Sequence, residues 1–265
     1  MAAKVVYTVL TGGYDRLQQP RVTCPGWDFV CFTDGPAGRD GVWELRPIPY
    51  QDTPVMMARW AKLHPHLLLP EYDFSVFMDA NLRIDGEDFY AILDEAREGK
   101  TSLLKLPWAV FAPYAALSHP ERDCVWEELR YCYLKDKLRT RSAIRWHRYL
   151  RQMAMPRHAG LAETNILARA HHQPDVVALD ERWWELLRLS GGSRDQLAFT
   201  PALVQLGLNP SLLFPMGSTA RNVSCIHYEQ HPVQSPQNVP GRLDWANLKY
   251  NLRLLWRKLV LLCLR

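Results

Sequence analysis

The sequence has no C-x-x-C pair and no group of cysteines at zinc-ligand spacing. Its six cysteines stand apart, at Cys24, Cys31, Cys124, Cys132, Cys225 and Cys263. This spacing gives no signal for a zinc knuckle or a redox dithiol. We therefore interpret the cysteines as reduced thiols of a hydrophobic core.

The sequence has only a small excess of positively charged residues. The formal net charge is +4 in a chain of 265 residues, far from the basic stripe that is typical of a dedicated nucleic-acid binder. We therefore expect no nucleic-acid partner. A mild excess of cations equally suits an anionic small-molecule substrate.

The start of the chain lacks the parts of a secretory leader. Met1-Ala2-Ala3-Lys4 runs directly into a strand-like segment, without a charged n-region, a long apolar run and a cleavage site. We therefore expect a cytoplasmic protein, in which the sequon Asn222-Val223-Ser224 has no role. Because no stretch is rich enough in Gly, Ser or Pro to mark a linker, we expect one domain over residues 1–240 and a helix over residues 241–265.

The composition and the residue patterns predict a folded α/β chain. Hydrophobic residues make up 48% and charged residues 23% of the sequence, as in ordinary globular proteins. We expect strands over residues 5–10, 28–33, 43–48, 74–78, 102–106, 165–167, 212–214 and 224–226, and helices over residues 54–69, 88–98 and 118–153, around residues 183–184 and from residue 193. Pro47 favours an edge position for its strand. Ser118, Pro120 and Glu121 have the spacing of a capping box at the start of the long helix.

Strands that alternate with helices predict a mixed, mostly parallel sheet with helices on both faces. In such a sheet, ligands bind beyond the carboxyl ends of the strands. Asp79-x-Asn81 lies at such a strand end, and its oxygens are the hard ligands that a divalent ion prefers. The same residues would also suit a simple turn, in which Asp79 caps the chain and Asn81 adopts a left-handed conformation.

Three further groups could carry chemistry. Arg59 and Lys62 are three residues apart on one helix face and could bind a diphosphate, although a surface helix would leave such a pair solvated. Asp195 and Gln196 follow Ser193 at the start of a helix, where they could orient a sugar hydroxyl or only complete a cap. His227 ends a short strand, and a neutral imidazole is a common metal ligand.

The last residues form a basic amphipathic pattern. Within residues 247–265, leucines and Trp256 are interleaved with Lys and Arg, and these cations argue against a membrane-spanning helix. Two interpretations remain open. The helix could lie on an anionic membrane surface, which would put the protein at the inner face of the membrane, or it could pack on its own domain.

Taken in order, these segments resemble a family first described as a domain of unknown function and now described as glycosyltransferase-like. It has plant members linked to cell-wall and mucilage polysaccharides, and many bacterial members. The resemblance spans about residues 5–200 and is carried by Tyr7-Thr8, Gly12-Gly13-Tyr14-Asp15, Phe29-x-Cys31-Phe32-Thr33-Asp34, Ala58-Arg59-x-x-Lys62-x-x-Pro65-His66, Met78-Asp79-Ala80-Asn81-Leu82-Arg83-Ile84, Gly160-Leu161-x-Glu163-Thr164, Trp183-Trp184 and Ser193-Arg194-Asp195-Gln196. A more distant similarity is to the glycogenin-type retaining transferases, which place an Arg before a D-x-D strand, an Asp-Gln pair after the sugar site and a His late in the chain.

The resemblance implies a single-domain, Rossmann-like GT-A fold that transfers a sugar from a nucleoside-diphosphate sugar to a glycan or lipid-linked acceptor. A UDP-sugar is the expected donor. The implied nucleoside pocket consists of Thr11, Gly12, Gly13, Tyr14 and Asp34. The implied donor-binding residues also include Arg59, Lys62, Asp79 and Asn81.

For the chemistry, the resemblance implies a divalent cation, Mn²⁺ or Mg²⁺, held on the diphosphate by Asp79, Asn81 and His227. Asp195, Gln196 and Glu163 are the implied catalytic residues. Asn81 stands where D-x-D enzymes have a second carboxylate, which weakens the expected metal site. Without the metal, Arg59, Lys62 or another cation would have to neutralise the leaving diphosphate.

Two other functions fit the same residues. One is a metal-dependent hydrolase in which Asp79, His227 and Asp195 act on water. The other is a catalytically silent GT-A-like binding or scaffold module, attached to a membrane through its tail.

Overall fold

A computed structural model of the chain describes residues 3–96, 101–189, 191, 194–230 and 245–263. Eight strands form one mixed sheet in the order β3-β4-β2-β1-β5-β8-β7-β9, and two short strands, β10 and β6, form a second sheet. The strands are β1 (Lys4–Leu10), β2 (Trp27–Thr33), β3 (Gly38–Asp40), β4 (Trp43–Pro47), β5 (Phe74–Met78), β6 (Leu82–Ile84), β7 (Val110–Ser118), β8 (Ala162–Arg169), β9 (Leu208–Leu212) and β10 (Ile226–Tyr228). The helices are α1 (Pro54–Leu63), α2 (Pro65–Leu68), α3 (Asp88–Ala96), α4 (Val125–Leu134), α5 (Thr140–Gln152), α6 (Pro174–Leu189), α7 (Gln196–Leu206) and α8 (Trp245–Cys263).

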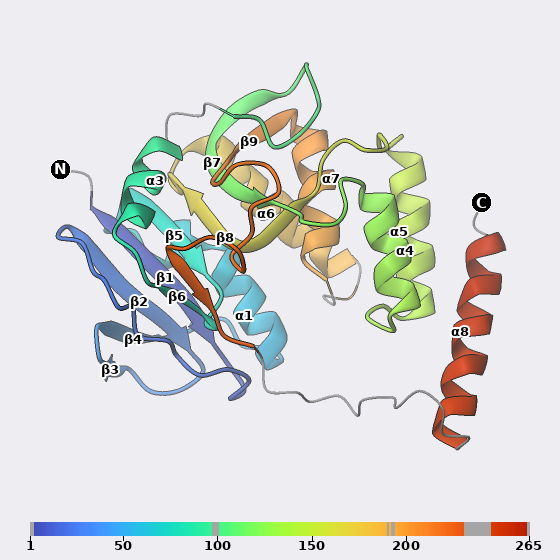
Figure 1. Cartoon of the computed structure of the whole chain (residues 1–265), viewed down its shortest axis with the longest axis horizontal. Coiled ribbons are helices and arrows are strands. Elements are labelled where there is room, and N and C mark those ends of the chain that lie inside the picture. The colour runs from blue at the N-terminus through green and yellow to red at the C-terminus, as the bar shows by residue number, and fades with distance from the viewer. Residues whose placement is uncertain (1–2, 97–100, 190, 192–193, 231–244, 264–265) are drawn as a thin grey trace.

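The sheet is parallel where β4, β2, β1 and β5 lie side by side, and β7 also pairs in parallel with β9. β8 runs antiparallel to both β5 and β7. Helices flank this sheet (Figure 1). The predicted α/β class with a mixed, mostly parallel sheet is therefore confirmed.

The central strands are buried on both faces, which explains their nearly continuous hydrophobic runs. Successive side chains of a strand point to opposite faces. In β1, Val5 and Tyr7 join a core with residues of α1, α6 and α7, whereas Val6 joins a second core with Phe89 and Leu93 of α3. The two cores lie on opposite faces of the sheet, the larger one against α1, α6 and α7 and the smaller one against α3 and the β6–β10 pair.

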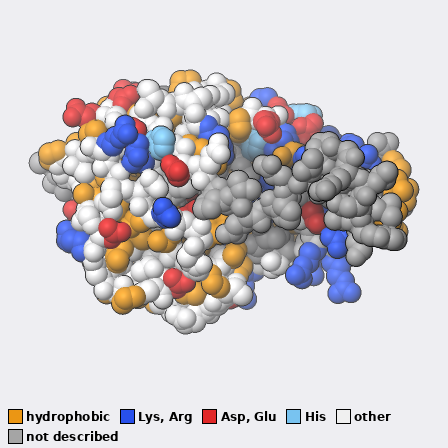
Figure 2. Space-filling view, turned by 60° about the horizontal axis from the view of Figure 1, so that its bottom comes forward, with side chains coloured by type: hydrophobic (Ala, Val, Ile, Leu, Met, Phe, Trp, Pro, Cys, Tyr) orange, Lys and Arg blue, Asp and Glu red, His pale blue; other side chains and the backbone are white. Residues whose placement is uncertain are grey.

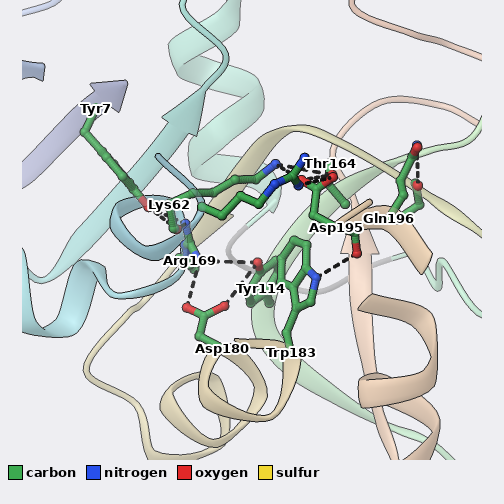
Figure 3. Close-up of polar contacts among 11 residues, drawn as sticks. Tyr7, Lys62, Tyr114, Thr164, Arg169, Asp180, Trp183, Asp195 and Gln196 are labelled. Atoms are coloured by element: carbon green, nitrogen blue, oxygen red, sulfur yellow. Dashed lines mark hydrogen bonds and ion pairs between the residues drawn. The ribbon is translucent and has the colours of Figure 1, made fainter. Parts of the chain in front are cut away.

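A buried ion pair lies inside the larger core, directly below the end of α1 (Figure 3). Arg169, at the end of β8, is fully buried, and its Nη1 donates to Asp180 Oδ2 of α6 at 2.7 Å. Its Nη2 donates to the carbonyl oxygen of Lys62 at 2.6 Å and also to the hydroxyl of Tyr7. The Tyr7 hydroxyl in turn donates to the same Lys62 oxygen at 2.7 Å. This network joins β1, β8, α1 and α6.

Two of the expected elements in the middle of the chain are wrong. Ser118 does not start a helix but ends β7, because this strand, which the sequence did not predict, pairs with β8 and β9. The long helix expected over residues 118–153 is two helices, α4 and α5, and α4 begins only at Val125. The expected strand at residues 102–106 is reduced to a bridge between Ser102 and Ser211.

Other boundaries shift by a few residues. The helix expected over residues 54–69 is divided at His64, where Pro65 follows and disfavours a helical conformation. The strand with Pro47 is not at the edge, since β3 pairs with its outer side. The strand expected at 212–214 spans 208–212, and the one expected at 224–226 spans 226–228. Of the helix expected over residues 241–265, the structure describes α8 from Trp245 to Cys263.

Three expectations lie outside the described residues. They concern the cap at Ser193, the end of α3 beyond residue 96 and the domain boundary between residues 240 and 241. Within the described residues, no helix combines the length and the apolar character that a membrane crossing needs.

The buried ion pair leads to the first prediction. Asp180→Asn would leave the Arg169 charge buried without its partner, so we expect the free energy of unfolding to fall by about 3–5 kcal/mol. Urea unfolding measures this loss. Asp175→Asn, in the exposed first turn of the same helix, is the matched control and should cost less than about 1 kcal/mol. Equal costs for the two variants would contradict a structural role for the pair.

Candidate functional site

A cleft of about 700 Å³ opens at the carboxyl ends of β1 and β5 and the amino end of β8. Its wall is built from segments that are far apart in the sequence. Of the predicted site residues, those that line it are Thr11, Gly12, Tyr14, Arg59, Lys62, Asp79, Asn81, Glu163, Asp195 and Gln196. Gly13, Asp34 and His227 are not among the described lining residues.

The turn after β1 forms one wall of the cleft. Gly12 and Gly13 both have positive φ angles, +63° and +61°, which glycine adopts without the strain that a side chain causes. The N–H of Gly12 donates to Asp34 Oδ2 at 2.7 Å, and the hydroxyl of Thr11 donates to the carbonyl oxygen of Pro54 at 2.8 Å. Asp34 therefore fixes the turn without itself lining the cleft.

Asp195 is a carboxylate of the cleft that is held by several neighbours. Its Oδ2 accepts from Lys62 Nζ at 2.7 Å, and its Oδ1 lies 3.0 Å from Arg59 Nη1. Lys62 also donates to the Thr164 hydroxyl at 3.3 Å. The carbonyl oxygen of Asp195 accepts from the indole of Trp183 at 2.8 Å. Asp195 therefore joins α1, β8 and α6 at the start of α7 (Figure 3).

The charges around Asp195 determine its ionisation. Burial by itself would raise the pKa of this carboxyl, but the charges and hydrogen bonds of Lys62 and Arg59 outweigh burial and hold the pKa well below its usual value. Asp195 is therefore ionised at neutral pH. It also lowers the net positive charge that Arg59 and Lys62 present to the cleft.

Glu163 and Gln196 also line the cleft. One carboxylate oxygen of Glu163 forms an ion pair with Arg221, whose guanidinium lies 4.5 Å from the ring centre of Tyr228. The other oxygen, Oε2, is buried without a hydrogen-bond partner. The side-chain amide of Gln196 donates to the carbonyl oxygen of Ala162 at 3.1 Å. The side chain of Gln196 is therefore held by β8.

Asp79 and Asn81 both reach the cleft from the end of β5. The N–H of Asp79 donates to the carbonyl oxygen of Asn165 at 2.9 Å, which extends the β5–β8 pairing to the cleft edge. Asn81 Nδ2 donates to the carbonyl oxygen of Glu229 at 2.9 Å. Only the Oδ1 atom of Asn81 could therefore serve as a metal ligand.

His227 does not share the cleft with Asp79 and Asn81. It belongs to β10, in which the next residue, Tyr228, lines the cleft. Neighbouring residues of a strand point to opposite faces, and His227 Nε2 lies 3.4 Å from Glu229 Oε2. The structure therefore does not place His227 in the lining of the cleft beside Asp79 and Asn81, and a metal ion held by all three stays a prediction.

Among the described residues, one group of His and carboxylate side chains has the spacing of a metal site elsewhere. The ligand atoms of Asp123, Glu127 and His158 lie within 4.8 Å of one another. Asp123 is already bonded to His158 Nδ1 at 2.6 Å and to Lys105 Nζ at 2.7 Å. None of these residues lines the cleft, so this group does not supply the expected divalent cation.

The structure adds cleft residues that were not predicted from the sequence. They are chiefly Lys137, Asn165, Arg221 and Tyr228. Asn165 could have been found, because Glu163, Thr164 and Asn165 form a polar run at the start of a strand that is buried along its whole length. Nothing in the sequence distinguishes Arg221 or Lys137 from the other cations.

The glycine turn leads to a prediction with an internal control. A Cβ atom on Gly12 would lie 3.0 Å from Pro54 Cβ, whereas one on Gly13 would meet nothing within 4 Å. Gly13→Ala should therefore cost about 1 kcal/mol through backbone strain alone. Gly12→Ala should cost more and should also weaken ligand binding. Thermal unfolding compares the two, and equal losses would show that the turn does not pack on α1.

The ionisation of Asp195 predicts how stability depends on pH. Because its folded-state pKa lies below the unfolded value, its contribution is complete above the unfolded pKa and is lost as the pH falls through the folded pKa. Asp195→Asn should cost about 3 kcal/mol at neutral pH, since it leaves Lys62 buried without its carboxylate.

Urea unfolding at a series of pH values tests this prediction. The difference in the free energy of unfolding between the wild type and Asp195→Asn should become smaller below about pH 4. Glu185→Gln, which breaks the exposed pair with Arg182, is the control and should change stability by less than about 1 kcal/mol. A difference for Asp195→Asn that is constant from neutral to acidic pH would contradict the assigned pairing.

When the chain is compared with known proteins, no family model matches it and no curated protein matches it in sequence. What the cleft can bind and do therefore follows from its own residues. These provide a fixed glycine turn, one strand-end carboxylate, two carboxylates paired with cations and several polar groups around a single space.

Proposed function

We propose that the protein is a glycosyltransferase with a GT-A fold, which transfers a sugar from a nucleoside-diphosphate sugar to a hydroxyl of a glycan or lipid-linked acceptor. One observation carries the proposal. The glycine turn, Arg59 and Lys62, Asp79 and Asn81, Glu163, and Asp195 with Gln196 come from five separate parts of the chain and line one cleft. Each of these groups, taken alone, has a simple structural explanation. Those explanations do not account for the presence of all five groups in one cleft.

The size and charge of the cleft suit such a donor. A volume of about 700 Å³ lies within the range of about 300–1,000 Å³ of small-molecule sites. The described lining contains five cationic side chains, namely Arg59, Lys62, Lys137, Arg194 and Arg221. Four carboxylates face the same space, and Lys62, Arg59 and Arg221 are already paired with two of them. Lys137 and Arg194 are therefore the cations best placed to bind the diphosphate.

Two buried acceptor atoms support a polyhydroxylated ligand. Glu163 Oε2 and Asn165 Oδ1 have no hydrogen-bond partner in the described structure, and both residues line the cleft. A buried acceptor without a donor costs free energy. The hydroxyl groups of a sugar would supply the missing donors.

In the proposed reaction, the acceptor oxygen forms a bond to the anomeric carbon while the bond from that carbon to the diphosphate oxygen breaks. The nucleoside diphosphate leaves with the bonding electrons and takes up the proton of the acceptor hydroxyl, and cationic side chains stabilise its remaining charge. Glu163 orients hydroxyl groups through its unpaired oxygen, and Asp195 fixes Lys62 and Arg59 in place. Positioning the two substrates lowers the entropic barrier to transfer.

The prediction for this function concerns the strand-end carboxylate. Asp79→Ala should lower glycosyl transfer by about a hundredfold or more, because it removes a hydrogen-bond acceptor that positions the donor at the wall of the cleft, and the protein should stay folded. Asp73→Ala changes the exposed Asp that precedes the same strand and should keep full activity. Turnover of Asp79→Ala equal to that of the wild type would refute the assigned role.

A nucleotide-binding screen tests the wider proposal. Calorimetry with UDP, GDP and CMP, each with Mn²⁺ and with EDTA, should show binding of a nucleoside diphosphate, with UDP the expected one. We expect this binding to persist in EDTA, since His227 does not line the cleft beside Asp79 and Asn81.

The same screen separates the two other functions. A scaffold module would bind none of the nucleotides. A hydrolase would release free sugar from a panel of nucleotide sugars, and no glycan acceptor would redirect that release into transfer.

A further inference from the structure

Helix α8 carries a row of large hydrophobic side chains on its surface. Leu252, Leu255, Trp256, Leu259 and Leu262 are each between 49% and 60% exposed. At 3.6 residues per turn, these five positions fall on one face of the helix. The described part of the chain has no other helix with so many exposed large hydrophobic residues.

A different face of α8 already packs on the domain. Arg257 donates to the carbonyl oxygen of Leu138 at 3.1 Å, and it also bonds to the Tyr133 carbonyl and the Asp136 carboxylate. Val260 and Leu261 pack against the larger hydrophobic core. The exposed row is therefore not needed to attach the helix to its own domain.

The charges that α8 itself carries next to the exposed row are positive, and one of them, Arg253, lies 3.9 Å from Asp136 of the loop between α4 and α5. Arg253, whose side chain is 73% exposed, and Lys258 flank the row on its two sides, and residues 245–265 contain no Asp or Glu. The neighbouring segment of α4 and α5, residues 125–152, has eight Lys and Arg against three Asp and Glu. The excess in these two segments is larger than the net charge of +4 of the whole chain, so the rest of the chain is net acidic. Figure 2 shows hydrophobic side chains at the α8 end of the molecule, close to Lys and Arg side chains.

We propose that this face of α8 binds an anionic lipid surface. The helix lies flat, the leucines and Trp256 enter the boundary between headgroups and acyl chains, and the flanking cations meet lipid phosphates. The cations of α4 and α5 add a longer-range attraction to the negative surface potential. The proposal does not depend on the activity of the cleft.

A second copy of the chain fits this face less well. Pairing two exposed rows would bring Arg253 and Lys258 of one copy near those of the other, and the helix has no carboxylate to pair with them. Like charges placed together at an interface oppose association. An anionic surface neutralises the same cations.

Binding to a membrane through α8 would also fix the position of the cleft relative to the lipid surface. Arg257 bonds to Asp136 and Leu138, on either side of Lys137, and Lys137 lines the cleft. The loop between α4 and α5 therefore contacts both α8 and the cleft. A lipid surface bound by α8 would hold that loop at a defined orientation.

Sedimentation of the full-length protein with vesicles tests the proposal. With vesicles of phosphatidylcholine and about one third phosphatidylserine, most of the protein should sediment, and the bound fraction should fall about tenfold with phosphatidylcholine alone and decrease as salt is added. Leu255→Glu with Leu259→Glu should abolish binding. Both side chains are exposed, so circular dichroism and the thermal midpoint should be unchanged.

Two further variants complete the test. Leu67→Glu with Met216→Glu adds the same charge at residues that are 58% and 60% exposed elsewhere, and it should bind vesicles like the wild type. Arg253→Gln with Lys258→Gln keeps every leucine and should still lose binding to the anionic vesicles. A wild-type protein that stays in the supernatant with both vesicle types would overturn the proposal. So would a dimer that the leucine variant splits into monomers while neither protein binds lipid.

Discussion

The carboxylate of Asp195 is the constraint on which the candidate site depends. It holds Lys62 and Arg59 of α1 against Thr164 of β8 at distances of 2.7–3.4 Å. On the other side of Lys62, the buried Arg169 fixes the carbonyl oxygen of the same residue. Lys62 is thus held at two points: Asp195 binds its side chain, and Arg169 binds its backbone carbonyl oxygen. A surface helix that carries two cations becomes a fixed wall of the cleft in this way.

Much of the fold could be predicted from the sequence because its signals are local. The runs of β1, β2 and β5 are hydrophobic on both faces, as strands covered by helices must be. The error at Ser118 shows where such signals fail. A capping-box pattern describes only a possible helix start, and at Ser118 the pairing of β7 with β8 and β9 outweighs it.

The candidate site was predictable in part for a similar reason. Asp79 and Asn81 lie at the end of a strand whose burial is visible in the sequence, and the position of that strand in the sheet places them. The side of β10 on which His227 lies depends on the pairing of β10 with β6, and no pattern of residues near His227 gives that register. Arg221 enters the cleft through a loop, where hydrophobic periodicity carries no information. Local sequence patterns thus locate strand ends. They do not show to which face the side chains of a short strand point, or which path a loop follows.

The arrangement of charge joins the cleft to the rest of the molecule. Asp195 and Glu163 pair with three of the five lining cations, so the cations that could meet a bound anion are concentrated at Lys137 and Arg194. Lys137 belongs to the loop on which α8 rests, and residues 125–152 and 245–265 together contain 13 Lys and Arg against three Asp and Glu. The positive potential of this end of the molecule therefore extends from the exposed face of α8 to the cleft wall. An anionic ligand in the cleft and an anionic surface at α8 would be attracted by the same part of the fold, and screening over about 10 Å at moderate salt still allows each to bind its own group of cations separately.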